Sequence, residues 1–507
     1  MRNIIFIMLF FLCGCSSLDI LNTKEEPTEP AKVVKKNEVY KDKVVIGIKR
    51  TYTLNPLTVK EEHTKDVLSL LFTNIAELKK DNTVELVLGE SYTYNPETNT
   101  GVLVLKDVLW QDGLSYVSSN DVIYSLNCIR NDSKSLYFNT ISNIKSYGKV
   151  DDKTVQFTLY EDRGGIPYFL LFPVIPSNHK NLETIDGAHF ENVIGNGFYK
   201  VSEYGINGNF TLEDNPYDDF TMGIKEIDII AHSDSKTQLY SFEEGLINFI
   251  QEDVSAWSKY HDDRSVNIVE NSTSSLEFIG FNYSTEMGNN LEFRKLVESI
   301  INFQNIIHNI YLDFCDYAYS TVQSNHFAYN KNLKYPKYDI DAGKDFLLKT
   351  GYNGEEILVL VNNENAERMR LAEELVSQLN NIGVKGVLVA LPYEDYIRRI
   401  DENYYHILVG GYNIGVFPNY GMLLGDNNIF NYTNDGMRDL LWQVDNSADM
   451  QSLTNNLLQL QQDVNDSLIF LPVLFKYNAI ITDENIKVYP PTSYVNAFYN
   501  INEWILE

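Results

Sequence analysis

The most informative segment of the chain is residues 110–121, which read Trp110-Gln111-Asp112-Gly113-Leu114-Ser115-Tyr116-Val117-Ser118-Ser119-Asn120-Asp121. Asp112-Gly113 predicts a tight turn directly after an aromatic core residue, Trp110. Ser118 with Asp121 three residues later has the form of a capping box, with Asp in place of the usual Glu, so a helix is expected to begin here. Three apolar residues at helical spacing would face the core: Val122, Leu126 and Ile129. Each feature has a structural explanation, and none indicates catalysis.

Outward from this segment, strands and helices are predicted to alternate. Residues 44–48 are apolar and mostly β-branched, which favours a strand. Residues 84–105 predict two strands around a turn at 95–99. Between them, a helix is indicated by four apolar residues at helical spacing: Val67, Leu68, Leu71 and Ile75. Further along, residues 364–383 predict a long amphipathic helix, and residues 384–390 predict the strand that follows it.

Further motifs follow in a fixed order: Phe172-Pro173-Val174-Ile175-Pro176, Ile194-Gly195-Asn196-Gly197-Phe198-Tyr199-Lys200, Asn215-Pro216-Tyr217, Glu244-Gly245, Phe293-Arg294-Lys295 and Lys349-Thr350-Gly351-Tyr352. Together with the Trp-x-Asp-Gly turn and the helix start at Ser118, they closely resemble the solute-binding proteins of peptide and nickel ABC importers, the bacterial extracellular solute-binding protein family 5. Each motif is weak alone, and the resemblance rests on their succession over residues 40–505.

The resemblance implies an α/β, two-lobed periplasmic-binding-protein-like fold of the cluster C type, with mixed sheets and a ligand cleft between the lobes. On this expectation the first lobe, with an inserted subdomain, comprises residues 43–275 and 475–507, and the second lobe comprises residues 276–474. The chain would cross between lobes near Asn271 to Glu277 and return near Leu471 to Lys476. The stretch from Tyr489-Pro490-Pro491 to Trp504 would then rejoin the first lobe.

The N-terminus predicts a lipid anchor. After Arg2, residues 4–13 form an apolar run that is too short to span a bilayer, which needs about 20 residues. Leu12-Cys13-Gly14-Cys15 resembles the bacterial lipobox, so residues 1–14 are expected to be a lipoprotein signal peptide and Cys15 the lipidated residue. Residues 15–42 would then be the anchor and a flexible tether. The alternative is an ordinary signal peptide. The lipid would hold the protein at the outer face of the bacterial cell membrane.

The two remaining cysteines, Cys128 and Cys315, lie far apart in the sequence and form no metal-ligand pattern. A disulfide between them is one alternative on an oxidising surface, and two buried free thiols are the expected state. No metal site and no cofactor are predicted.

Composition excludes one class of partner. The chain has 507 residues, and 70 Asp and Glu against 41 Lys and Arg give a net charge of -29. A field of this sign repels phosphate backbones, so no nucleic acid is expected as a partner. A hydrophobic fraction of 44% is that of a chain with a sizeable core.

The family resemblance implies capture and not catalysis. Its peptide-binding members hold an extended peptide largely through main-chain hydrogen bonds, and then dock on ABC permease subunits that a separate ATPase powers. A monomer is expected. Those members carry an Asp that pairs with the peptide ammonium group shortly after a Gly-Trp pair, whereas this chain has Gly411 for the Trp and Asn413 or Ile414 for the Asp. Either another acid serves, such as Glu394 or Asp395, or the ligand has no ammonium group there.

The residues expected to contact the ligand lie at the end of the first strand, in the cleft loop and shortly after it: Tyr52, Thr53, Tyr412, Asn413, Phe417, Asn431 and Tyr432. For the aromatic residues among them, the alternative is core packing.

Three other functions are alternatives. The same fold binding an oligosaccharide, an opine or a nickel chelate is the nearest alternative. A secreted hydrolase is disfavoured because the chain has no Gly-x-Ser-x-Gly elbow and no His-Glu-x-x-His motif. A surface adhesin or sensor that keeps the fold without transport is the third.

Overall fold

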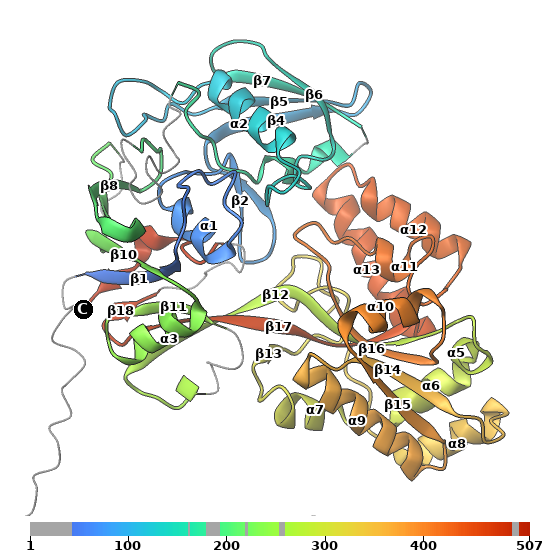
Figure 1. Cartoon of the computed structure of the whole chain (residues 1–507). Coiled ribbons are helices and arrows are strands. Elements are labelled where there is room, and N and C mark those ends of the chain that lie inside the picture. Colours follow the sequence, from blue (N-terminus) through green and yellow to red (C-terminus); the bar gives the residue numbers. More distant parts are fainter. Residues whose placement is uncertain (1–42, 161–162, 179–192, 218–221, 253–258, 489–495) are drawn as a thin grey trace, which may run out of the picture.

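The computed structural model describes residues 43–160, 163–178, 193–217, 222–252, 259–488 and 496–507. Two α/β lobes are joined by a pair of long antiparallel strands, β12 (Val266–Phe281) and β17 (Phe470–Asp483) (Figure 1). The signal segment, Cys15, the tether and Tyr489-Pro490-Pro491 lie outside the described residues.

One mixed sheet runs through both lobes. Within the described residues it has 11 strands in the order β15-β14-β16-β12-β17-β11-β1-β10-β9-β8, with β13 paired to β17. Parallel pairs, such as β1 with β10 and β14 with β15, occur beside antiparallel ones, such as β12 with β16. The strands not yet placed are β1 (Val44–Lys49), β8 (Tyr199–Tyr204), β9 (Phe210–Asp214), β10 (Glu226–His232), β11 (Phe249–Glu252), β13 (Cys315–Asp316), β14 (Ile357–Asn362), β15 (Gly386–Leu391) and β16 (Ile407–Asn413). The expected mixed sheets are confirmed.

Lobe I carries β1, β8 to β11, and a subdomain at the top of Figure 1. The subdomain is an antiparallel four-stranded sheet in the order β4-β5-β7-β6, packed against α2 (Ser119–Asn131). Its strands are β4 (Gly89–Asn95), β5 (Thr100–Leu105), β6 (Ile144–Lys149) and β7 (Thr154–Leu159). Other described elements of this lobe are α1 (Glu62–Ser69), the hairpin β2 (Ala76–Leu78) and β3 (Val84–Leu86), α3 (Ser235–Glu243), and the pair β18 (Ile486–Lys487) and β19 (Ile505–Leu506).

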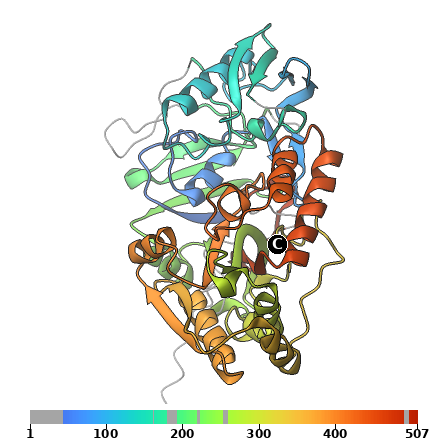
Figure 2. The same ribbon diagram turned by 90° about the vertical axis from the view of Figure 1, so that its right-hand side faces the viewer.

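Lobe II carries β13 to β16 and the helices that follow β12. Figure 2 shows α12 and α13, in orange-red, standing on the side of lobe II that faces lobe I. Several helices begin at side chains that accept a hydrogen bond from the backbone of the first turn, as N-caps do: Asp339, Asn365, Asn434 and Asp449. The helices are α5 (Glu286–Asn289), α6 (Leu291–Ile300), α7 (Phe303–Asn309), α8 (Ile340–Thr350), α9 (Ala366–Asn381), α10 (Tyr393–Asp401), α11 (Gly421–Leu424), α12 (Asp435–Asp445) and α13 (Met450–Ser467).

The sequence motifs of lobe I meet in one hydrogen-bonded cluster. Gln111 Nε2 donates to the carbonyl oxygens of Tyr199 (2.6 Å) and Gly197 (3.2 Å), and its Oε1 accepts from Gly195 N (2.9 Å). Asn215 Nδ2 also donates to Gly197 O at 3.0 Å. A Cβ atom on either glycine would overlap a backbone carbonyl of the segment after α1, so only glycine fits. The lobe I motifs that contain Gln111, Gly197 and Asn215 are therefore held together by direct contacts within that lobe.

The capping box at Ser118 is confirmed. Ser118 N donates to Asp121 Oδ2 at 2.9 Å, and the other carboxylate oxygen of Asp121 accepts from Ser177 N at 2.8 Å. Asp121 thus begins α2 and also holds the segment that follows the Pro-rich motif. The three apolar residues expected to face inward, and Trp110, are buried.

One helix is shorter than expected. α1 ends at Ser69, so Leu71 and Ile75 are buried outside it. The reason is tertiary pairing, because Leu71 O accepts hydrogen bonds from Asn196 N and Gly197 N, at 3.0 Å and 2.9 Å. These bonds replace a further helical turn.

The C-terminal segment packs into lobe I. The rings of Phe498 and Trp504 stack on Phe249 of β11, with centroids 5.2 Å and 6.2 Å apart. Both belong to the hydrophobic core that also contains β1. This packing supports the proposed return of the chain to the first lobe.

Cys128 is partly buried, Cys315 is buried, and both are free thiols. Among the described residues, no helix is long and apolar enough to cross a membrane.

Candidate functional site: the cleft between the lobes

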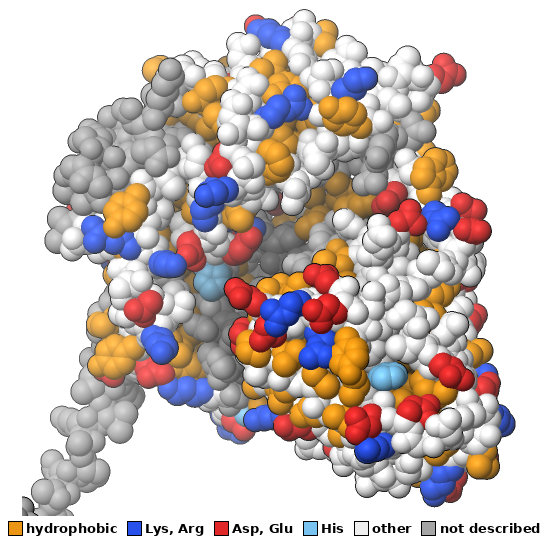
Figure 3. Space-filling model, turned by 45° about the vertical axis from the view of Figure 1, so that its right-hand side comes forward, with side chains coloured by type: hydrophobic (Ala, Val, Ile, Leu, Met, Phe, Trp, Pro, Cys, Tyr) orange, Lys and Arg blue, Asp and Glu red, His pale blue; other side chains and the backbone are white. Residues whose placement is uncertain are grey.

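A cavity of about 980 Å³ lies between the lobes, and Figure 3 shows the surface hollowed there. Lobe I contributes α1, part of β2, the loop at 136–143 and residues 166–173. Lobe II contributes the end of β16 and the loop that follows it. The lobes also touch beside the cavity, where Phe327 N donates to Asp81 O at 2.9 Å and Asn325 Nδ2 donates to Lys80 O at 2.8 Å.

The strands that join the lobes change register at the floor of the cavity. Ser272 pairs with Tyr477 and Leu276 pairs with Phe475, so the three residues 273–275 of β12 face a single residue of β17. All three line the cavity. A bulge of this kind bends a strand and leaves its extra residues outside the ladder. It lies within the stretch where the sequence places the change of lobe, which supports the proposed lobe bounds.

The end of β16 and the loop that follows it supply three of the predicted contact residues. Tyr412, Asn413 and Phe417 all line the cavity. Asn413 Oδ1 accepts hydrogen bonds from Ser274 Oγ (2.6 Å) and Gly415 N (2.8 Å), which fixes the loop to the bulge. The ring of Phe417 meets Tyr168 of lobe I edge to face, with centroids 5.1 Å apart. This aromatic pair spans the cleft.

The other four predicted contact residues lie outside the cavity lining. Tyr52 is 57% exposed and lies under the guanidinium of Arg50, and the Thr53 hydroxyl bonds Thr58 at 3.1 Å. Asn431 and Tyr432 line a separate pocket of about 390 Å³ in lobe II.

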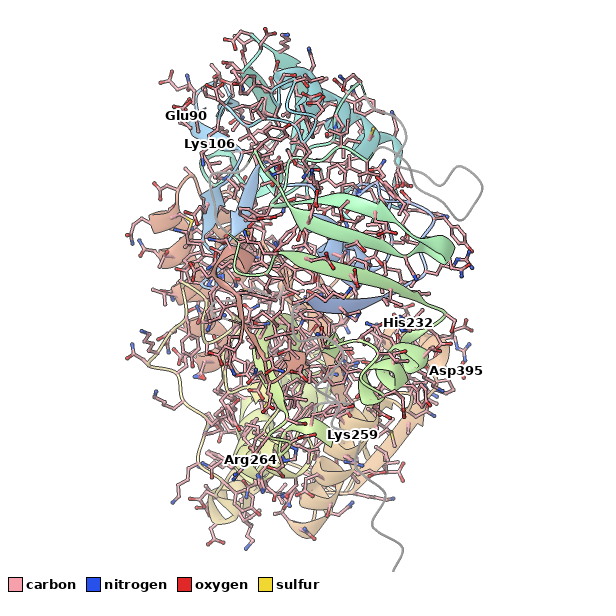
Figure 4. The ribbon with its side chains drawn as sticks, turned by 90° about the vertical axis from the view of Figure 1, so that its left-hand side faces the viewer. Glu90, Lys106, His232, Lys259, Arg264 and Asp395 are labelled. Carbon is pink, nitrogen blue, oxygen red and sulfur yellow. The ribbon has the colours of Figure 1, made fainter. Side chains whose placement is uncertain are left out.

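The alternative acids also lie outside the cavity lining. Glu394 and Asp395 are in the first turn of α10, where Asp395 pairs with Arg398. Figure 4 shows Asp395 near the outer edge of the molecule, below His232 of β10. The acids that do line the cavity come mainly from lobe I: Glu62, Asp66, Glu77 and Asp445. Sequence reasoning missed them, because a lone acid in so acidic a chain carries no signal of its own.

Two of these acids belong to a charge network on α1. Lys65 Nζ lies 2.6 Å from Glu62 Oε2 and 3.8 Å from Asp66 Oδ1. Asp66 Oδ2 accepts a hydrogen bond from Gln251 Nε2 at 2.9 Å. Burial raises the pKa of Asp66, whereas Lys65 acts to lower it. Burial also opposes the charge on Lys65, but the neighbouring carboxylates raise its pKa. Both carboxylates of this network are thus engaged, and Lys65 is their shared cationic partner.

Glu77 differs from this network. Burial, followed by the charge of Glu85 opposite it in the hairpin, raises the pKa of Glu77 to about 7. Within the described residues, no hydrogen bond or ion pair engages its carboxylate. Two tyrosines of the cavity, Tyr137 and Tyr499, lie within electrostatic range of it.

Gly411 has a structural role beside the cavity. A Cβ atom there would overlap the guanidinium of Arg368 and come within 2.7 Å of Glu277 Oε1. The space that an aromatic residue would take is thus filled by the buried ion pair of Arg368 with Glu277. No group of three or more His, Cys, Asp or Glu side chains in the described part of the chain could hold a metal ion.

Comparison with known proteins gives one family. The model of the bacterial extracellular solute-binding proteins, family 5, matches residues 83–431, which is more than half of the chain. Di/tripeptide-binding protein 1 of Pseudomonas aeruginosa (strain UCBPP-PA14) is 24% identical over 51% of this chain and 50% of its own, so the chain spans about half the length of that relative. Heme-binding protein A of Haemophilus influenzae is 22% identical over 71% of this chain and 70% of its own.

The solved structure of HbpA2 from Haemophilus parasuis superimposes with a TM-score of 0.78, covering 92% of this chain and 100% of that one at 19% identity, and shows the same fold. The expected two-lobed fold is confirmed. On the family match, this chain is a member of the bacterial extracellular solute-binding proteins, family 5.

Proposed function

We propose that this chain captures an extended oligopeptide between its two lobes and delivers it to the permease of an ABC importer. The observation that carries the proposal is the cavity of about 980 Å³ at the interlobe bulge. Its volume lies at the upper end of the usual range for ligand pockets, about 300–1,000 Å³, so it suits a ligand larger than a single amino acid.

The lining supports main-chain recognition. Residues 273–275 leave the ladder with β17, and the loop from Ile414 to Asn419 is irregular. Some backbone groups here are already engaged, since Ile414 N donates to Ser274 O and Ser275 N donates to Thr273 Oγ1. The remaining backbone groups of the lining can bond the main chain of an extended peptide. The similarity to a di/tripeptide-binding protein supports the same ligand class.

The protein would act without catalysis, as a monomer held at the outer face of the membrane by a lipid on Cys15. The tether would let the lobes reach the permease. These features rest on the family and on the lipobox-like sequence at residues 12–15.

A planar or cyclic solute is the second candidate. Aromatic side chains from both lobes line the cavity, including Tyr168, Tyr412 and Phe417, and such rings stack on flat ligands and on sugars. The similarity to a heme-binding protein favours this candidate on separate grounds.

The test is a thermal-shift screen of residues 40–507 against peptide pools, heme, sugars and nickel chelates. A ligand at a concentration of 100 Kd stabilises the folded state by about 2.7 kcal/mol. A rise in the melting temperature with peptides supports the proposal. A rise with heme or a sugar and none with any peptide pool would refute it.

A further inference from the structure

We propose, on the basis of the proposed function, that the ligand of the cleft carries a positively charged organic group, and that Glu77 of lobe I is the residue that pairs with it. Asn413 is neutral, and Glu394 and Asp395 lie outside the cavity lining. Asp445, the lobe II acid that does line the cavity, is already engaged in an interaction, so we assign the ion-pairing role to lobe I. It falls to an acid in the short strand β2.

The hairpin places Glu77 at the cavity. Side chains alternate between the two faces of a strand, and Ala76 and Leu78 on either side of Glu77 are buried. Glu77 itself is partly buried and lines the cavity. Leu78 beside it also lines the cavity, and the hairpin pairing places Glu77 directly opposite Glu85.

The charge of Glu77 lacks a counterion in the described part of the chain. The nearby cations are already engaged, because Lys79 lies 3.6 Å from Glu85 Oε2, and Lys65 pairs with Glu62 and Asp66. The like charge of Glu85 adds to the cost of an uncompensated carboxylate. A cationic ligand group would remove that cost, so binding would favour such a ligand over a neutral one.

The surroundings suit an organic cation. Tyr137 and Tyr499 line the cavity, and the charge of Glu77 is among the causes that raise the pKa of each. Burial is the largest cause for both tyrosines. An ammonium or guanidinium group that lies between a carboxylate and aromatic rings is stabilised by the ion pair with the carboxylate and by cation–π attraction to the rings. A bare metal ion is disfavoured, because the described residues offer no cluster of three ligating side chains.

The test is isothermal titration of the full-length purified chain with defined tetrapeptides that are basic, neutral or acidic, each with a free or acetylated N-terminus, and with spermidine. The wild type should bind peptides that carry a cationic group about tenfold or more tightly than acetylated acidic ones. Glu77→Gln should abolish that preference. The matched control, Glu394→Gln, removes an acid outside the cavity lining and should keep it. The free and acetylated arms tell an N-terminal ammonium from a side-chain cation.

The outcomes separate the two proposals. If peptides bind and Glu77→Gln keeps the preference, the role of Glu77 is wrong and the peptide function stands. If only spermidine binds, and Glu77→Gln abolishes its binding, the peptide function is wrong and the role of Glu77 stands. If neither peptides nor spermidine bind the wild type, both are wrong. Should Glu77→Gln bind nothing at all, its melting temperature distinguishes misfolding from loss of the site, since removal of an uncompensated charge should raise it.

Discussion

Arg368 of α9 holds Glu277 of β12 through two hydrogen bonds, from Nε to Oε2 at 2.7 Å and from Nη2 to Oε1 at 2.9 Å. The Glu277 side chain is fully buried, and Lys476 Nζ approaches it at 3.5 Å from the paired strand. A two-point arginine contact with a carboxylate is among the stronger charge pairs in proteins. This pair lies where β12 enters lobe II, one residue from Leu276, at which the ladder resumes after the bulge.

Arg368→Met should lower the free energy of unfolding by about 3 kcal/mol, because it leaves a buried carboxylate with Lys476 as its remaining cationic neighbour. Urea denaturation followed by fluorescence measures this. The control is Arg370→Met, an exposed arginine on the same helix, which should change the value by less than about 0.5 kcal/mol. Equal effects of the two variants would mean that the ion pair contributes nothing specific.

Gly411→Ala should destabilise the wild type through the same pair, since the new methyl group displaces the Arg368 guanidinium from Glu277. In the Arg368→Met background the ion pair is already lost. Gly411→Ala should therefore lower the free energy of unfolding there by at least about 1 kcal/mol less than it does in the wild type. A double-mutant cycle by denaturation gives the coupling energy. Additive effects would show that Gly411 is needed for some other reason.

Gln111→Ala should lower the free energy of unfolding by about 2–3 kcal/mol, because the carbonyl oxygen of Tyr199 and the amide of Gly195 each lose a partner. Gln451→Ala is the control, since that exposed side chain bonds Asn455 of its own helix. The comparison is made by denaturation under identical conditions. A small loss at Gln111 would mean that water replaces its amide.

Short-range features were predictable from the sequence. The strand at Val44 and the capping box at Ser118 depend on residues a few positions apart, so local pattern decides them. The fold was predicted from the succession of motifs. The hydrogen-bonded cluster around Gln111 explains why the lobe I motifs occur together.

The candidate site was less predictable, because tertiary contacts decide it. Tyr412 and Asn413 end a strand and Phe417 lies in the loop after it, a region that could be placed by resemblance. The place of Glu77 in the cavity lining could not be predicted from the sequence. Ala76-Glu77-Leu78 has the pattern of any short strand, and only the tertiary structure places it at the cavity. Asn431 was predicted to contact the ligand, but its side chain donates hydrogen bonds to Asn282 and Asn403 within lobe II.

Cys15→Ser should move the protein from the membrane fraction to the soluble fraction, because the proposed anchor is a lipid on that cysteine. Fractionation with an immunoblot measures this. Cys13→Ser, two residues earlier, is the matched control and should leave the protein at the membrane. Retention of the Cys15→Ser variant in the membrane fraction would rule out the lipoprotein assignment.

The pH dependence of stability should carry the signature of Glu77. Its folded-state pKa, about 7, lies above the ordinary value of 4.5, so the folded state binds more protons than the unfolded state between these values. The ligand-free wild type should therefore lose stability relative to Glu77→Gln as the pH rises from 4.5 to 7, by roughly 2–3 kcal/mol. Melting curves of both chains across that range measure the difference. A cationic ligand should reverse the trend and release a proton, detected by titration calorimetry in buffers of different ionisation enthalpy. Parallel curves for the two chains would contradict the isolated charge.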